Sequence, residues 1–440
     1  MKEEDVIQTV KRENVKFIQL QFTDILGTVK SITIPSTQLK KALEEGIFFD
    51  GSSVLGYATI EESDMRLKPD PNSFVILPWT ENDLKTARMV CEVYDHAGNR
   101  FEGDPRWALE RITKIARKQG WICYTAPEYE FFLLLQTENG EPTTKPSDYG
   151  GYFDLMRDRG ENVRKEIVNY LNAMGFEVEA SHHEVAPGQH EIDLKYADAI
   201  TSADRVSMMK YVTKTIAEKH GLYATFMPKP IYGVNGSGMH THISLMTSEG
   251  KNVFYDPKGP YKLSQEALCF IGGLIRYARE ICAILASTVN SYKRLVPGYE
   301  APVYISWANL NRSAYIRVPA GREIKTRVEV RSPDPAGNPY LQFTVMLAAG
   351  LKGIEEKILP PDPIERDIYR MTPEERETMG IESLPANLGE ALECMRKSKL
   401  VREALGDHLF HHFLYVKRKE WEEYSAQITD WEIRNLLPLL

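Results

Sequence analysis

The chain has 440 residues, of which 42% are hydrophobic and 26% charged, and its formal net charge is −8 at pH 7. This composition is ordinary for a globular protein of about two domains, and the acidic balance argues against nucleic acid or an anionic membrane as a partner. The sequence shows no apolar run of membrane-spanning length, no signal-peptide pattern and five cysteines without metal-type spacing, so we expect a cytoplasmic protein with free thiols.

The first hundred residues predict a small sheet with one packed helix. Apolar and charged residues alternate with helical spacing over 3–14, and a short helix is expected over 38–45, ending at Gly46. Four β-rich runs accompany these helices, at 15–22, 28–34, 74–77 and 87–94. We therefore expect a β-grasp-like domain over residues 1–103.

A second domain begins at a clear helix start, where Asp104 is a candidate N-cap and Pro105 takes the first helical position. Strands and helices then mix without a regular βαβ alternation, which favours an α+β fold. We expect a large catalytic domain over 104–440, with a curved antiparallel sheet flanked by helices and a helical stretch over 387–436. Polar or Gly- and Pro-rich loops are expected at 138–151, 229–238, 290–302 and 360–363.

The most informative pattern is a set of carboxylates inside apolar strands. Glu128 and Glu130 lie two residues apart in an apolar run, so on a strand they point to the same face. A turn signal at 186–189 predicts a hairpin that brings Glu184 near Glu191. Two further runs place polar side chains on one strand face each, His240, His242 and Ser244 in one and Arg327, Glu329 and Arg331 in the other.

These side chains favour hard divalent cations. Five glutamates and one histidine are the oxygen-rich donor set of Mg²⁺, with Mn²⁺ as an alternative, and metals beside arginines suit phosphoryl transfer. The sequence has no Walker A motif. Each feature also has a plain structural interpretation, such as an exposed sheet face or a hydrogen-bonded histidine. The spacing predicts a metal-dependent, nucleotide-using enzyme and leaves its acceptor open.

Several long motifs resemble those of glutamine synthetases of the bacterial and archaeal type I. They lie at 49–53, 62–67, 229–244, 290–302 and 327–340, and the resemblance covers the whole chain. It implies ATP-dependent ligation of ammonia to the γ-carboxylate of glutamate through γ-glutamyl phosphate. It also implies two or more Mg²⁺ ions per subunit and a dodecamer of two six-membered rings with active sites between subunits.

The resemblance also implies a role for individual residues. One metal would bind Glu130, Glu184 and Glu191, and the other Glu128, His240 and Glu329. Glutamate would meet Asn235, Gly236, Arg294, Glu300, Arg312 and Arg331. ATP would meet Glu179, Tyr196, His242, Ser244, Arg312, Arg317 and Arg327. The catalytic residues would be Asp50 from the neighbouring subunit, which deprotonates ammonium, Glu300 on a closing loop, and Arg312 on the transferring phosphate.

The sequence departs from the pattern of the glutamine synthetases that it resembles at two places that concern regulation. The stretch between Glu130 and Glu184 is short, which resembles the subgroup without adenylylation control, so we expect Tyr369 to stay unmodified. Thr59 stands where glutamine-sensing relatives carry an arginine, and threonine cannot make the bidentate contact of a guanidinium. We therefore predict weak feedback inhibition by glutamine, which a low-micromolar inhibition constant would contradict. Another metabolite or a nitrogen-signalling protein could serve as regulator.

Three alternatives stay open on the sequence. The first is a γ-glutamyl ligase that uses a polyamine or another amine on the same scaffold. The second is a non-catalytic relative, which we disfavour because the six metal positions and the arginines are all present. The third is an unrelated metal hydrolase, which would need neither Arg294 nor the Glu300 loop.

Overall fold

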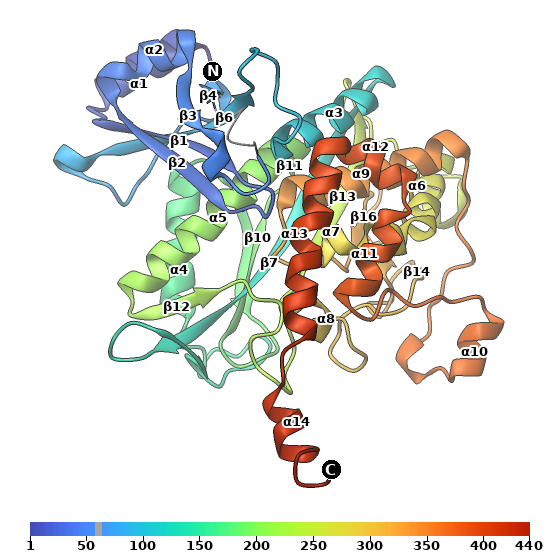
Figure 1. Cartoon of the computed structure of the whole chain (residues 1–440). Coiled ribbons are helices and arrows are strands. Elements are labelled where there is room, and N and C mark those ends of the chain that lie inside the picture. Colours follow the sequence, from blue (N-terminus) through green and yellow to red (C-terminus); the bar gives the residue numbers. More distant parts are fainter. Residues whose placement is uncertain (58–63) are drawn as a thin grey trace.

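The computed structural model describes residues 1–57 and 64–440. The N-terminal domain is a sheet of six strands in the order β2-β1-β6-β4-β3, with β5 added to β6. Its strands are β1 (Phe17–Thr23), β2 (Val29–Pro35), β3 (Ile47–Asp50), β4 (Asp64–Pro69), β5 (Val75–Ile76) and β6 (Thr86–Tyr94). The pair β1–β6 is parallel. Helices α1 (Glu3–Arg12) and α2 (Leu39–Glu45) cover this sheet (Figure 1).

The predicted elements of this domain are confirmed, and two strands were missed. Helix α1 has acidic residues in its first turn and basic residues in its last, which complements the helix dipole. Helix α2 ends at Gly46, whose φ of 80° favours glycine. Strands β3 and β4 were not predicted. Met65, Leu67 and Pro69 of β4 are buried and alternate with charged residues, a strand pattern that was overlooked in the sequence.

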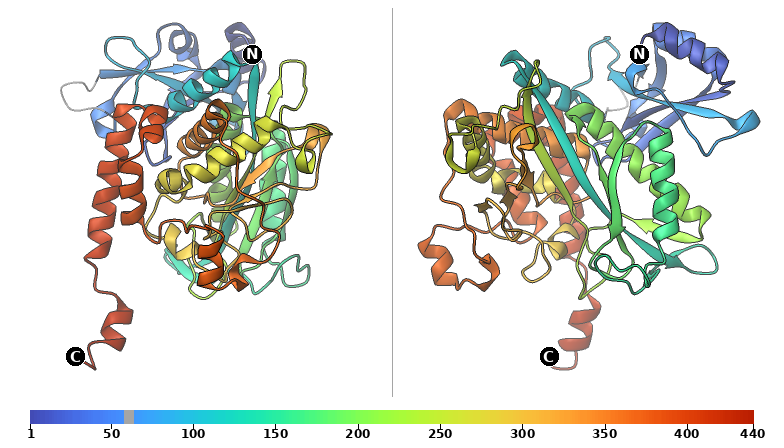
Figure 2. Two further views of the ribbon diagram at one scale, coloured as in Figure 1. Left: turned by 90° about the vertical axis from the view of Figure 1, so that its right-hand side faces the viewer. Right: turned by 180° about the vertical axis from the view of Figure 1, so that it is seen from behind.

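The C-terminal domain is organised around one long strand, β7 (Trp121–Gln136), which Figure 2 shows crossing the molecule. The main path of its sheet has the order β14-β15-β16-β13-β7-β10-β9. Its other strands are β8 (Pro142–Pro146), β9 (Val178–His183), β10 (Gln189–Leu194), β11 (Ala197–Asp198), β12 (Leu222–Thr225), β13 (Met239–Thr247), β14 (Trp307–Ala308), β15 (Ile316–Arg317) and β16 (Val328–Val330).

Two expectations for this sheet need correction. The sheet was expected to be antiparallel, but its short edge pair β14–β15 is parallel. Residues 138–151 were expected to be a loop, but β8 lies within them and pairs with the end of β7. Strand β8 was hidden because its residues Pro142–Pro146 contain two prolines and no hydrophobic residue.

Helices cover the sheet and build the main core. The expected start of α3 (Pro105–Lys118) is confirmed, because the Asp104 side chain accepts a hydrogen bond from Arg106 N. Helices α6 (Gln265–Arg276) and α9 (Pro339–Glu356) pack closely through Gly273 and Gly353. The remaining helices are α4 (Glu161–Ala173), α5 (Ala199–Lys219), α7 (Ala278–Leu285), α8 (Ser291–Arg294), α10 (Pro373–Thr378), α11 (Leu388–Arg396), α12 (Lys399–Leu405), α13 (Asp407–Ser425) and α14 (Asp430–Asn435).

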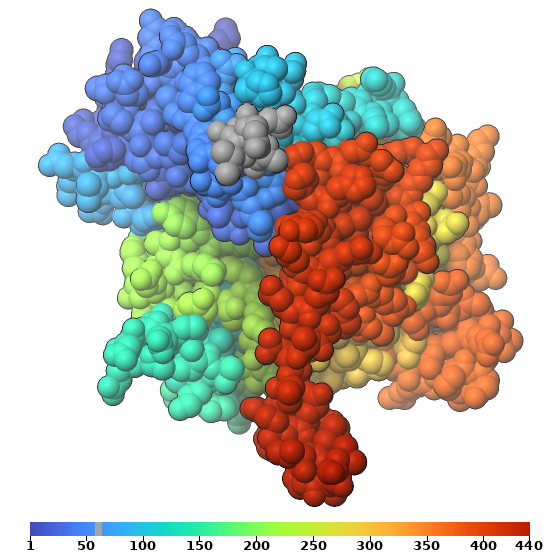
Figure 3. All heavy atoms as spheres, in the orientation of Figure 1, coloured from blue at the N-terminus to red at the C-terminus, as the bar shows by residue number. Residues whose placement is uncertain are grey.

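The helical C-terminal stretch is confirmed, and its end stands clear of the rest of the chain. Helix α14 projects beyond the body of the molecule (Figures 1 and 3). Trp431 and Leu437 are exposed there. Among the described residues, none of the helices combines the length and apolar character needed to cross a membrane.

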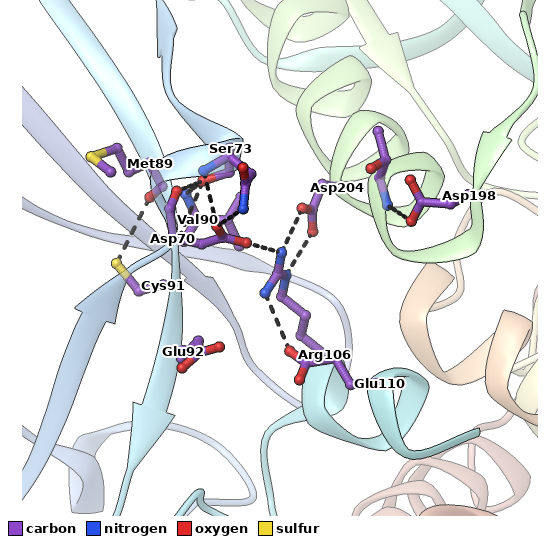
Figure 4. A network of polar contacts seen from close by, with 12 residues as sticks. Asp70, Ser73, Met89, Val90, Cys91, Glu92, Arg106, Glu110, Asp198 and Asp204 are labelled. Atoms are coloured by element: carbon purple, nitrogen blue, oxygen red, sulfur yellow. Dashed lines mark hydrogen bonds and ion pairs between the residues drawn. The ribbon is translucent and has the colours of Figure 1, made fainter. Parts of the chain in front are cut away.

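An ion-pair network joins the two domains (Figure 4). Arg106 of α3 is 6% exposed. Its guanidinium lies 2.7 Å from Asp70 of the N-terminal domain, 3.0 Å from Asp204 of α5 and 3.3 Å from Glu110. Tyr340 donates a further hydrogen bond to Asp204. We propose that the domain boundary lies at residues 103/104, immediately before the helix that carries Arg106.

The Arg106→Met variant is expected to lower the free energy of unfolding by about 3–5 kcal/mol, because it leaves buried carboxylates without their cation. Urea unfolding followed by circular dichroism measures the change. The matched control is Arg396→Met, whose pair with Glu393 is about half exposed and worth roughly 0–1 kcal/mol. Equal stability of the two variants would contradict the importance of the network.

Candidate active site

Cross-strand register brings the predicted carboxylates together on one face of the sheet. Glu130 of β7 pairs with Glu191 of β10, and Glu128 lies between Asp193 of β10 and His240 of β13. Because side chains alternate along a strand, these residues project from the same face. The predicted hairpin is confirmed, since β9 and β10 pair and Glu184 N donates to Gln189 O at their turn.

The first cluster contains Glu128, His240 and Glu329, whose ligand atoms lie within 4.8 Å of one another. His240 Nδ1 lies 3.1 Å from Glu128 Oε2 and 4.0 Å from Glu329 Oε1. Glu329 is fully buried, and its two oxygens accept hydrogen bonds from Arg317 and Arg331 at 2.5 and 2.6 Å. Two cations thus hold the carboxylate of Glu329 in place.

The second cluster contains Glu184, Glu191 and His182. His182 Nε2 lies 3.2 Å from Glu191 Oε1, and His182 Nδ1 lies 3.6 Å from Glu184 Oε1. Glu130 lines the same cavity. One of its oxygens accepts hydrogen bonds from Gln189 Nε2 and Gly238 N, at 2.8 and 3.0 Å. The structure therefore adds His182 to the set expected from the sequence.

The electrostatics of these groups fit a bound cation. Burial, reinforced by repulsion from Glu130 and Asp193, raises the pKa of Glu191 to about 12. Burial likewise raises the pKa of Glu184 to about 7 and lowers that of His240 to about 4. A divalent cation would offset the crowding of carboxylates, and a neutral imidazole is the form that binds metal. Carboxylates with a neutral imidazole are a donor set for Mg²⁺ or Mn²⁺.

Two cavities meet at this cluster. The first has a volume of about 590 Å³. It is lined by all six expected metal ligands and by Asn235, Gly236, Arg294, Glu300, Arg312, Arg317 and Arg331. The second has about 410 Å³ and is lined by the expected nucleotide contacts Glu179, Tyr196, His242, Ser244 and Arg327. Glu128 and Asp193 line both cavities, so the clusters lie where the two spaces adjoin.

Arg294 is held rigidly in the first cavity. It is 2% exposed, and its guanidinium donates to the backbone carbonyls of Arg331, Ser332 and Pro333. The loop beside it needs glycine, because a Cβ at Gly236 would lie 2.3 Å from Pro228 O and one at Gly238 2.5 Å from Arg294 Nη2. Glycine at these two positions therefore lets the loop backbone pack closely against Pro228 and Arg294.

Three contacts, two from the 229–238 loop and one from Tyr369, hold the Glu300 loop beside the first cavity. Asn235 Nδ2 donates to Glu300 Oε2 at 3.2 Å, and the Lys229 ammonium lies 3.7 Å from the centre of the Tyr299 ring. The Tyr369 hydroxyl donates to Ala301 O. Glu300 itself has a φ of 57°, a conformation that costs a non-glycine residue energy and is common at functional sites.

Asp50 is the expected site residue that lines neither of these two cavities of its own chain. It is exposed at the end of β3, where it accepts hydrogen bonds from Ser52 N, Ser52 Oγ and Ser53 Oγ. The two serine hydroxyls and the Ser52 amide lower the pKa of Asp50 and keep it ionised. Thr59 and the first residues of the motif at 62–67 lie outside the described residues.

Some cavity residues were missed by the sequence reasoning. His182 precedes Glu184 by two positions and Asp193 follows Glu191 by two, so the alternation rule that identified the glutamates could have found both. Burial raises the pKa of Asp193 to about 6. Tyr152 also lines the cavity, but it lies in a segment without regular structure and carries no spacing signal.

A buried network supports the hairpin from behind. His183 and Asp148 have no exposed side-chain surface, and His183 Nε2 lies 2.9 Å from Asp148 Oδ1. Asp148 also accepts from Arg159 N and Gly188 N, and His183 Nδ1 lies 2.7 Å from Glu184 O. The network ties the loop before α4 to the turn that carries Glu184.

Carboxylate clusters suited to divalent metals lie where two cavities adjoin, and arginines line the first cavity. This arrangement is typical of enzymes that transfer phosphoryl groups. Residues 14–96 match the model of the glutamine synthetase beta-Grasp domain, and residues 102–436 match the glutamine synthetase catalytic domain. The chain belongs to the glutamine synthetase family. Members of this family use ATP and a divalent metal, act on glutamate and ammonia, and form oligomers.

Similar proteins cover almost the whole chain. Glutamine synthetase of Thermus thermophilus is 55% identical over 438 residues, covering 98% of each chain. Glutamine synthetase of Methanosarcina mazei is 54% identical over 438 residues, covering 99% of this chain and 98% of the relative. A solved structure described as a GmaS/ADP complex is 34% identical, covers 99% of each chain and superposes with a TM-score of 0.89. The β-grasp and catalytic domains expected from the sequence are thereby confirmed.

Proposed function

We propose that the protein is a glutamate–ammonia ligase that uses ATP to make glutamine through γ-glutamyl phosphate. The observation that carries the proposal is the junction of two cavities at Glu128 and Asp193. One cavity offers space for a nucleotide and the other for a small anionic amino acid beside Arg294. Their shared wall is where a phosphoryl group would pass from one substrate to the other.

The two carboxylate clusters would hold the metals. Glu128, His240 and Glu329 would hold one ion, and Glu130, Glu184 and Glu191 the other, with His182 beside the second set. When bound, Mg²⁺, or Mn²⁺ in its place, would neutralise charge on the phosphate oxygens and the leaving group.

The remaining residues would bind and orient the substrates. Asn235, Gly236, Arg294 and Arg331 would hold glutamate, with Arg294 on its α-carboxylate. Glu179, Tyr196, His242, Ser244, Arg317 and Arg327 would contact ATP. Arg312 lines the first cavity, where its guanidinium would face the transferring phosphate and stabilise its charge.

The proposed reaction then proceeds in two displacement steps. An oxygen of the glutamate γ-carboxylate bonds to the γ-phosphorus of ATP, and the bond to the bridging oxygen breaks to release ADP. Asp50 of a neighbouring subunit takes a proton from ammonium, because ammonium itself has no free electron pair. Ammonia then attacks the acyl carbon and displaces phosphate, while Glu300 and its loop exclude water from the acyl phosphate.

We also propose the assembly that this mechanism requires. Asp50 lines neither of the two cavities of the proposed site in its own chain, so in this mechanism a second subunit brings its Asp50 to the first cavity. A dodecamer of two six-membered rings meets this need, and the projecting helix α14 with its exposed apolar residues is suited to contact the other ring. A nitrogen-signalling protein is a candidate regulator of the assembly.

Isotope transfer tests the proposed intermediate. Glutamate labelled with oxygen-18 in its γ-carboxylate should pass one labelled oxygen to phosphate for each glutamine formed, because phosphate leaves with an oxygen of the former carboxylate. Mass spectrometry of the released phosphate measures the transfer. Glutamine formation with unlabelled phosphate would rule out γ-glutamyl phosphate.

The Asp148→Ala variant is expected to weaken Mn²⁺ binding by about 10–100-fold, because removing a residue that orients a metal ligand has an effect of that size. Asp148 acts here through His183 and the turn at Gly188. Calorimetric titration measures the affinity, with Asp154→Ala in the same loop as the matched control. An unchanged dissociation constant would show that the network does not position the hairpin.

A further inference from the structure

A further cavity lies between the two domains, away from the proposed active site. Its volume is about 700 Å³, within the range of small-molecule sites. Its walls come from β4, β5 and β6 of the N-terminal domain and from α3, α5 and the Met174–Phe176 turn of the catalytic domain. The Arg106 network in Figure 4 forms part of this wall.

An unpartnered cation faces this cavity. Arg88 of β6 lines it and is only 2% exposed. Within residues 1–57 and 64–440, its Nε and Nη1 atoms are buried and have no hydrogen-bond acceptor. Its guanidinium stands 5.8 Å from the centre of the Phe176 ring. Buried donors are almost always satisfied, so a guanidinium in this state indicates a missing anionic partner.

The wall carries six carboxylates and six cations, and four of the six cations make no ion pair within the described residues. Five carboxylates are already bound by cations or backbone N–H groups, namely Asp70, Glu92, Glu110, Asp198 and Asp204. Glu3 is the sixth. The cations Lys68, Arg117 and Arg205 make no ion pair within the part of the chain that the structure describes, and Arg205 lies 5.5 Å from the centre of the Phe176 ring. The Phe176 ring thus lies close to one guanidinium from each domain, that of Arg88 and that of Arg205.

We propose that this interdomain cavity binds a small multivalent anion, a dicarboxylate or a phosphorylated metabolite, with Arg88 as its main ligand and Arg205 as a second. The two arginines come from different domains, so the bound anion bridges them. A guanidinium binds carboxylate and phosphate oxygens in the same two-pronged manner. Their shared chemistry defines the ligand class, and it does not depend on the reaction at the active site.

Thermal unfolding of the full-length protein tests this site. The probes are sodium succinate for the dicarboxylates and sodium phosphate for the phosphorylated class, each compared with sodium chloride at the same ionic strength. The test variant is Arg88→Met, which removes the guanidinium and keeps an apolar stem. The control is Arg66→Met, on β4 of the same domain but outside the cavity wall. Both variants keep the active site, so binding there cancels in the comparison.

We expect one of the two probes to raise the melting temperature of the wild type and of Arg66→Met but not of Arg88→Met, because a ligand stabilises only the fold that binds it. The probe with the larger shift identifies the class. If Arg88→Met does not fold, Arg205→Met takes its place with the same expectation. An equal shift in all variants, or no shift with either anion, would overturn the proposal.

Discussion

Replacing Glu329 by glutamine is expected to lower kcat/KM about 1000-fold, a loss of about 4 kcal/mol in transition-state stabilisation. Glu329 is fully buried, and its carboxylate lies between Arg317 and Arg331 beside His240. Burial raises its pKa, but the charge of Arg331, helped by His242 and His240, outweighs this effect and holds the pKa below the usual range. Glutamine keeps the shape but removes the charge, so the proposed metal site would lose a carboxylate and both guanidiniums would lose their counter-charge.

Steady-state phosphate release at several Mg²⁺ concentrations measures this effect. The matched control is Glu355→Gln on α9, whose carboxylate is 63% exposed and pairs with Lys352, and we expect its activity to equal that of the wild type. Added Mg²⁺ should restore part of the Glu329→Gln activity if metal binding is the main loss. Activity of Glu329→Gln within tenfold of the wild type would remove Glu329 from the proposed metal site.

The Asp50→Asn variant is expected to lose about 10²–10⁴-fold of its activity with ammonium, the usual contribution of a general base. Asp50 is ionised because Ser52 and Ser53 donate hydrogen bonds to it. Hydroxylamine is a neutral nucleophile at pH 7 and needs no deprotonation before attack. The same variant should therefore keep most of its activity with hydroxylamine.

The ratio of the two activities distinguishes a base from a merely structural residue. A residue that only shapes β3 would lower both activities together when replaced. Asp83→Asn, in an exposed turn of the same domain, serves as the control and should change neither activity. An equal loss with ammonium and hydroxylamine would contradict the assignment of Asp50 as the base.

The candidate site was largely predictable because its carboxylates interrupt apolar strands. Glu128 and Glu130 stand in a long strand whose other residues are mostly apolar, so alternation fixed their common face. The turn at 186–189 then fixed the approach of Glu184 to Glu191. His182 and Asp193 obey the same alternation, but the prediction rested on glutamates and therefore did not include them. The roles of individual residues came from the family resemblance rather than from spacing.

Contacts between distant segments were not predictable from the sequence. Arg106 and Asp204 lie 98 residues apart, and nothing in either segment indicates that they meet. Arg88 reads as one charged residue in the β-rich run at 87–94, and only the structure shows that it is buried without an acceptor. Local sequence patterns could not predict strands β3 and β14 either. Each strand is short and is recognised only by its pairing with a neighbouring strand.

The most direct test of the proposed function is the stoichiometry of products with different amines. Purified protein would be incubated with glutamate, ATP and Mg²⁺, alone, with ammonium, or with a polyamine or methylamine, and both phosphate and the amide product would be quantified. We predict glutamine and phosphate in equal amounts with ammonium, and little of either without it. Phosphate without glutamine, or product only with the larger amine, would contradict a glutamate–ammonia ligase.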